Sequence, residues 1–152
     1  IQSVTTEGAT FMPPPMRFEA GTPAIAETIA WASACDYLQA QNTAHRLHYK
    51  QLLTLYLMER LQQMPHITVY GAHKDKVPVA AFTHAFIHPH DLASILDGSG
   101  VAVRAGHHCA MPLHQALNIA ATTRASLTFY NNTTDIDRLI LGIKQAEEIF
   151  NG

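Results

Sequence analysis

The sequence has 152 residues, of which 47% are hydrophobic, and its formal net charge at pH 7 is −2. A chain of this length and composition can bury the core of one domain, with or without an additional segment. The small net charge gives no electrostatic basis for binding nucleic acid or an anionic membrane. No apolar run approaches the roughly 18 residues of a transmembrane helix, so we expect no membrane insertion.

The two cysteines, Cys35 and Cys109, are too few for a disulfide framework. A reducing compartment such as the cytoplasm fits them best. No secretory signal peptide is visible. The first residue is Ile1 rather than methionine, which indicates that the sequence begins inside a longer gene product.

The first part of the chain predicts an extended arm followed by a helix. Residues 1–4 can form a strand, and the prolines at 13–15 stiffen the arm. Thr22 followed by Pro23 is typical of a helix start, with threonine as N-cap, and the helix should run to about Ala40. Cys35 falls inside this helix, and we interpret it as a packing residue.

Helices and short strands alternate through the rest of the chain. A leucine-rich stripe predicts a helix over residues 43–64, ended by Pro65. Thr134 is expected to cap the last helix, with its isoleucines and leucines, Ile136, Leu139, Ile140, Ile143 and Ile149, facing inward. Between these helices the pattern predicts strands at 67–70, 77–87, 101–104 and 123–130, a polar turn at 72–76, and helices at 91–97 and 112–117. Burying each apolar face requires a small sheet with helices on one side, which is an α/β or α+β domain.

A cysteine lies in the segment from Arg104 to Pro112, between an apolar strand and a short helix. Gly106 is expected to break the strand, and Pro112 suits the first turn of the helix. Cys109 is therefore expected in a tight loop just before a helix N-terminus. The thiolate is the reactive form of cysteine, and helix N-termini and cationic neighbours favour it.

Two other interpretations of this cysteine remain open. A lone cysteine is often a small buried hydrophobic residue. A metal site formed by His107, His108 and Cys109 has only His114 as a nearby fourth ligand, whereas zinc sites need about four ligands, usually from paired motifs. We therefore expect no metal.

The segment from Arg104 to Pro112 closely resembles the active-site cysteine loop of SufS-type (group II) cysteine desulfurases, a class V aminotransferase group of pyridoxal-phosphate enzymes. Two further stretches match in the same order, residues 18–23 upstream and residues 123–126 with Tyr130–Asn131 downstream. The resemblance covers essentially the whole chain. It implies the C-terminal domain of a fold-type I pyridoxal-phosphate enzyme, with residues 1–41 as the end of the large cofactor domain and its connecting helix, and residues 42–152 as the small domain.

The resemblance also implies roles for individual residues. Cys109 matches the nucleophile that takes sulfur from L-cysteine, leaving L-alanine and a persulfide for iron–sulfur cluster assembly. Arg124 matches the clamp on the substrate carboxylate, although a surface or capping arginine is the alternative. Thr22 matches a residue that reaches the cofactor phosphate of the opposite subunit in a homodimer, and a plain N-cap is its alternative.

The supporting residues and partners are implied in the same way. Arg104, His107 and His108 either tune the thiol and its proton transfers or hold the loop in shape. The implied partners are the substrate and a sulfur-acceptor protein. Three alternatives stay open: a selenocysteine lyase, a noncatalytic module that docks a sulfur acceptor, and a metal-binding domain.

The resemblance leaves one component unaccounted for. The lysine that holds pyridoxal phosphate is expected before Ile1, because none of the lysines at 50, 74, 76 and 144 lies in a matching context. We therefore expect this segment alone not to bind the cofactor productively.

Overall fold

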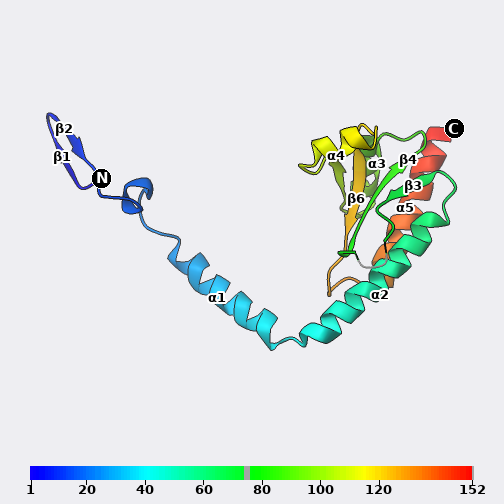
Figure 1. Ribbon diagram of the computed structural model, residues 1–152, viewed down its shortest axis with the longest axis horizontal. Helices are drawn as coiled ribbons and strands as arrows, with labels where there is room; N and C mark the ends of the chain where they lie inside the picture. Colours follow the sequence, from blue (N-terminus) through cyan, green and yellow to red (C-terminus); the bar gives the residue numbers. More distant parts are fainter. Residues whose placement is uncertain (74–75, 152) are drawn as a thin grey trace. The chain divides into compact units, whose positions relative to one another are not determined.

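The computed structural model describes residues 1–73 and 76–151, and its ribbon is drawn in Figure 1. Lys74 and Asp75, which belong to the predicted polar turn, lie outside the described residues. The chain divides into two compact units, Ile1–Asn42 and Thr43–Gly152. No helix within the described ranges is both long enough and apolar enough to cross a membrane.

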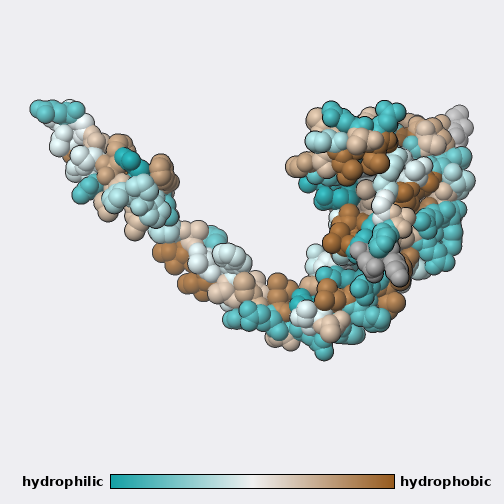
Figure 2. Space-filling view, in the orientation of Figure 1, coloured by the Kyte–Doolittle hydropathy of each residue, from teal (hydrophilic) through white to brown (hydrophobic). Residues whose placement is uncertain are grey.

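The N-terminal unit has little internal packing. It contains a hairpin of β1 (Ser3–Thr5) and β2 (Gly8–Thr10), a 3₁₀ turn η1 (Met16–Phe18) and the helix α1 (Ile25–Ala40). None of its residues is buried. Apolar side chains such as Trp31, 72% exposed, therefore lie at the surface along α1, where Figure 2 also shows hydrophobic residues.

Two predictions for α1 are wrong. The helix begins at Ile25 with Ala24 as N-cap, and no side chain caps it, so Thr22 is not the N-cap. Ala24 with ψ 72° is not yet helical, so the helix begins two residues later than a cap at Thr22 requires. Cys35 is exposed, and the unit has no core against which it can pack.

The C-terminal unit is built on a four-stranded sheet with the order β3-β4-β6-β5. Every neighbouring pair is antiparallel, so the unit is an α+β domain, which confirms the predicted small sheet packed against helices. Its elements in chain order are α2 (Thr43–Gln62), β3 (Ile67–Tyr70), β4 (Val79–His84), α3 (Pro89–Gly98), β5 (Arg104–Gly106), α4 (Met111–Ala116), β6 (Thr122–Ser126) and α5 (Thr133–Asn151).

The two faces of the sheet have different environments because side chains alternate along each strand. One face carries Ala80, Phe82 and Ala125 and packs against the helices, and Phe82 has no exposed surface. The helices that cover this face are α2, α3 and α5 (Figure 1), and they contribute the buried residues Leu57, Leu61, Leu92, Leu96, Ile136, Ile140 and Ile143. We call the opposite face, which carries Ala81, Thr122 and Arg124, the open face.

The segment before β5 differs from its prediction. The strand expected at 101–104 is instead Arg104–Gly106, and Gly106 completes the strand opposite Thr122 rather than breaking it. The reason is the end of α3. Gly100 adopts a positive φ of 74°, and the N–H of Val101 donates to Leu96 O, so this backbone terminates the helix and is not available for strand pairing.

The last helix starts and packs slightly differently from its prediction. Asn132 Oδ1, not Thr134, accepts the N–H groups of Thr134 and Asp135, which makes Asn132 the capping side chain. Ile149 is 65% exposed and does not face inward. It follows buried Ile143 and Ala146 by two steps of three residues, which together fall about 120° short of two helical turns, so its side chain lies off the core-facing stripe.

Candidate active site

Cys109 lies in a tight turn between β5 and α4. The N–H of Ala110 donates to His107 O at 2.8 Å, which closes the turn over His108 and Cys109. Both central residues have positive φ, 54° and 60°, a conformation that residues other than glycine adopt rarely and at a cost. The thiol is exposed, so the interpretation of Cys109 as a buried hydrophobic residue does not hold.

The turn is fixed to β6 by hydrogen bonds that converge on one threonine. His108 Nε2 lies 3.0 Å from Thr122 Oγ1 and 3.2 Å from Thr122 O. His114, on α4, places Nε2 at 3.2 Å from the same hydroxyl and Nδ1 at 3.0 Å from Ala110 O. Both Thr122 and His114 are buried, so these bonds are shielded from water.

Sequence reasoning missed this threonine and considered His114 only as a metal ligand. Thr122 precedes Arg124 by two residues, so strand alternation places both side chains on one face, and this was the available signal. Its hydrogen-bond partners depend on the pairing of β5 with β6, for which the sequence pattern made no prediction.

His108 is held in its neutral form. Burial of the ring lowers its pKa, and the nearby positive charge of Arg124 lowers it further. Arg104 and His114 act in the same direction, while the hydrogen bond to the carbonyl of Thr122 opposes them. The ring therefore stays uncharged around neutral pH, and its Nδ1 is buried without a hydrogen-bond partner among the described residues.

Arg104 and Arg124 face each other across β5 and β6 as direct register partners. Neither forms a salt bridge with a described residue, and Arg124 Nε is buried without a partner there. Like charges opposite one another destabilise a sheet, and a buried unpaired donor adds to that cost. An anion with two oxygens, such as a carboxylate, would satisfy both guanidinium groups.

The other predicted residues lie outside this group. Thr22 belongs to the N-terminal unit, just ahead of α1. His107 is exposed, and its ring packs edge-on against His114 with centroids 5.4 Å apart. Within the described ranges, no group of three or more His, Cys, Asp or Glu residues is arranged to hold a metal ion.

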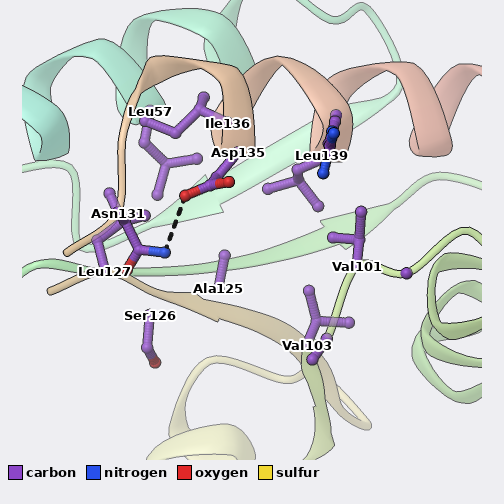
Figure 3. A pocket seen from close by; sticks show the side chains of 13 residues that line it. Leu57, Val101, Val103, Ala125, Ser126, Leu127, Asn131, Asp135, Ile136 and Leu139 are labelled. Atoms are coloured by element: carbon purple, nitrogen blue, oxygen red, sulfur yellow. Dashed lines mark hydrogen bonds between the residues drawn. The ribbon is translucent and has the colours of Figure 1, made fainter.

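A separate pocket of about 250 Å³ lies between the start of α5 and the segment that precedes β5. Figure 3 shows apolar side chains, including Leu57, Val103 and Leu139, around it, and one hydrogen bond between Asn131 and Asp135 at 3.1 Å. None of its lining residues belongs to the Cys109 turn. The pocket is therefore distinct from the turn that carries Cys109.

Comparison with known proteins links this arrangement to one group of enzymes. The profile of the aminotransferase class-V family matches residues 1–139. A probable cysteine desulfurase of Staphylococcus aureus (strain Mu50) is 44% identical over 152 residues, which cover 99% of this chain and 37% of the relative. The cysteine desulfurase of Haloferax volcanii is 42% identical over 151 residues, covering 99% of this chain and 35% of the relative.

Solved structures give the same result for the fold. The cysteine desulfurase CsdA of Escherichia coli matches 97% of this chain and 36% of its own, with a TM-score of 0.77 and 29% identity. The apo cysteine desulfurase of Thermococcus onnurineus matches 96% of this chain and 37% of its own, with a TM-score of 0.76 and 32% identity. The chain thus spans little more than a third of the length of these relatives, and its sheet and helices match the C-terminal part of their structures.

Proposed function

Because the chain belongs to the aminotransferase class-V family, we propose that it is the part of a pyridoxal-phosphate-dependent cysteine desulfurase that carries the sulfur-accepting cysteine. The enzyme removes sulfur from L-cysteine and leaves L-alanine. The observation that supports this most strongly is an exposed cysteine in a strained turn anchored to Thr122, two residues before Arg124, which lacks a carboxylate partner in the described chain.

In this proposal Cys109 is the nucleophile. Its thiolate sulfur forms an S–S bond to the sulfur of the substrate, and the C–S bond of the substrate breaks. The bonding electrons stay with the carbon fragment, which takes up a proton and leaves as alanine, while Cys109 keeps the persulfide. Pyridoxal phosphate, when bound, supplies the electron sink that makes this bond cleavage possible.

Arg124 and Arg104 hold the substrate carboxylate in this proposal. The planar fork of a guanidinium pairs with both oxygens of a carboxylate, and such charge-assisted bonds fix the orientation of the substrate. Burial and the nearby Arg124 lower the pKa of His108, so the two arginines supply the positive charge that binds the carboxylate. The arrangement therefore binds an amino acid by its carboxylate, next to the thiol that attacks its sulfur.

The N-terminal unit contributes to the cofactor site in this proposal. No side chain caps the start of α1, so the helix N-terminus, with the exposed hydroxyl of Thr22 ahead of it, suits a phosphate group. Thr22 of one subunit reaches the phosphate held by the opposite subunit, so the working enzyme is a homodimer. Residues 1–41 then form the end of the cofactor domain.

The fate of the sulfur follows from the short turn. Because Cys109 is anchored on both sides, its persulfide cannot move far, and a cytoplasmic acceptor protein has to come to it. We propose a SufS-like role in which that acceptor carries sulfur to iron–sulfur cluster assembly.

The test uses the full-length protein that contains this segment, loaded with pyridoxal phosphate and given L-cysteine. We expect alanine release, and mass spectrometry should find one added sulfur on the peptide that contains Cys109. Cys109→Ser should abolish both, whereas Cys35→Ser, in α1, should leave both unchanged. A persulfide on Cys35, or full activity of the Cys109→Ser protein, would contradict the proposal. A protein that releases no alanine would instead support a noncatalytic docking module.

A further inference from the structure

We infer that Thr122 and His114 are positioning residues for Cys109, acting together as a hydrogen-bonded clamp that fixes both sides of its turn to β6. This inference rests on the proposed role of Cys109 as nucleophile. His108 precedes the cysteine and Ala110 follows it, and each is tied to the clamp. Cys109 thus lies between two anchored residues, His108 and Ala110.

The direction of each hydrogen bond can be assigned from the chemistry of the groups. Ala110 O can only accept, so His114 Nδ1 carries the proton that it donates. In the neutral ring, His114 Nε2 is then an acceptor and receives the hydroxyl proton of Thr122. Since Thr122 Oγ1 has used its proton, it accepts from His108 Nε2–H, which also points at Thr122 O. All partners are satisfied in one consistent chain from Ala110 to His108.

This series of hydrogen bonds fixes the tautomer of His108 as well as its position. Because Nε2 carries the proton, Nδ1 is left as an unprotonated acceptor, and it is the atom that has no partner among the described residues. The ring therefore has one tautomer and one orientation next to the thiol. Loss of the Thr122 hydroxyl removes the nearer acceptor for His108, leaving the Thr122 carbonyl at 3.2 Å, and removes the donor to His114 in the same step.

The turn needs such a clamp because its conformation is not intrinsically favoured. Two successive residues other than glycine with positive φ persist only where the surroundings hold them. Among the described residues, Cys109 has no side-chain hydrogen bond of its own that would do so, and the backbone contributes the bond from Ala110 to His107. The clamp also connects the thiol to β6 at a point two residues from Arg124, so it sets the distance between the nucleophile and the carboxylate site.

The chain offers a matched pair of substitutions to test this. Thr122→Val removes the shared hydroxyl while keeping the shape of the side chain. Thr123→Val makes the same change one residue later, at a buried hydroxyl that has no described partner and faces the helices. Thr122→Ser restores the hydroxyl and serves as the rescue variant.

The first measurement is steady-state kinetics of the full-length holoenzyme with L-cysteine. For Thr122→Val we expect kcat to fall by about tenfold to a hundredfold, since misplacement of a reacting group by about 1 Å has effects of this size. KM should stay close to wild type, because Arg124 and Arg104 still hold the carboxylate. Thr122→Ser should recover most of kcat, and Thr123→Val should match wild type.

The second measurement does not depend on activity. Hydrogen–deuterium exchange of the peptide over residues 107–110 should become faster in Thr122→Val and stay slow in Thr122→Ser and Thr123→Val. Equal effects of Thr122→Val and Thr123→Val on both measurements would overturn the inference. If the wild-type enzyme releases no alanine, the proposed function fails, while the exchange result still decides whether the clamp exists.

His114 provides an independent test if Thr122→Val does not fold. His114→Leu removes both bonds, and His114→Gln keeps a donor and acceptor near the position of Nε2. We expect the leucine variant to show the lower kcat and faster exchange, with partial recovery in the glutamine variant. Combining His114→Leu with Thr122→Val should cost less than the sum of the two single changes, because both break the bond between His114 and Thr122. Fully additive effects would show that the two residues act separately.

Discussion

Arg124 lies in the middle of β6, between Ala81 on one side and Arg104 on the other. At this position the strand register sets the chemistry, because it brings two guanidinium groups together and supplies no carboxylate from the described strands. A lysine at the same position would keep the charge but lose the planar fork that pairs with two oxygens. The geometry of the arginine, rather than its charge alone, therefore carries the proposed role.

We predict that Arg124→Lys weakens substrate use much more than it weakens folding. Loss of a charge-assisted hydrogen bond of about 1.5 to 3 kcal/mol corresponds to a drop in kcat/KM of about tenfold to a hundredfold. Alanine release measures this, and thermal unfolding should change little. The matched control is Arg138→Lys, an exposed arginine on α5, which should retain wild-type kinetics. Wild-type kinetics for Arg124→Lys would remove it from the site.

The residues of the candidate site were predictable to different degrees. Cys109 and Arg104 lie in one contiguous segment and Arg124 in a second short segment, residues 123–126, so all three could be chosen from the resemblance of these segments to the family. Thr122 and His114 could not, because their roles come from hydrogen bonds to His108 and Ala110 that depend on how β5 pairs with β6 and on where α4 begins. The site residues chosen from sequence stay predictions of function until the variants are measured.

Among the elements, those with a strong local pattern were predicted well. β3 and the long helix α2 match their predicted ranges closely, and β4 is a central strand as expected. β5 was displaced because Val101 and Val103 have high β-propensity, whereas the end of α3 uses the backbone of residues 100–101. The hydrogen bond that ends α3 thus outweighed the β-propensity of these residues.

The contact between α3 and α5 gives a prediction at this scale. A Cβ added at Gly142 would lie 2.6 Å from Leu96 Cδ2, and Leu96 is fully buried and cannot easily move away. Alanine favours a helix over glycine by about 1 kcal/mol, but overpacking of a core costs about 1 to 3 kcal/mol. We therefore expect Gly142→Ala to destabilise the domain, as measured by urea unfolding.

Gly98 provides the matched control for this substitution. It is the last residue of α3, and a Cβ added there meets nothing within 4 Å among the described atoms. Gly98→Ala should therefore leave stability unchanged or raise it slightly. Equal stability of the two alanine variants would show that α3 and α5 can separate enough to accept the extra methyl group.

At the scale of the whole chain, the two units differ in how well they are stabilised by their own contacts. The C-terminal unit has a continuous core that joins the sheet to α2, α3 and α5. The N-terminal unit has no buried residue, and a single helix such as α1 is marginally stable in water without a packing partner. The proposed chemistry needs both units, because Cys109 and Arg124 lie in one and Thr22 in the other.

We predict that the 152-residue chain alone, mixed with pyridoxal phosphate and L-cysteine, releases no alanine and shows no absorbance from a covalently attached cofactor. The proposed reaction requires a lysine that holds the cofactor beside Arg124. Lys50 and Lys144 extend from α2 and α5, helices on the side of the sheet opposite the open face. Lys76 Nζ lies 3.6 Å from Met58 Sδ of α2, and burial lowers its pKa.

The measurement is an absorbance spectrum after removal of free cofactor, together with an assay for alanine. Lys74 lies outside the described residues, so a Lys74→Ala chain serves as the control for the remaining lysine. A cofactor band that persists in the chain and disappears on Lys74→Ala would contradict the prediction and identify the lysine responsible. A colourless, inactive chain beside an active full-length protein would show that Cys109 and its clamp depend on residues outside this segment for cofactor attachment.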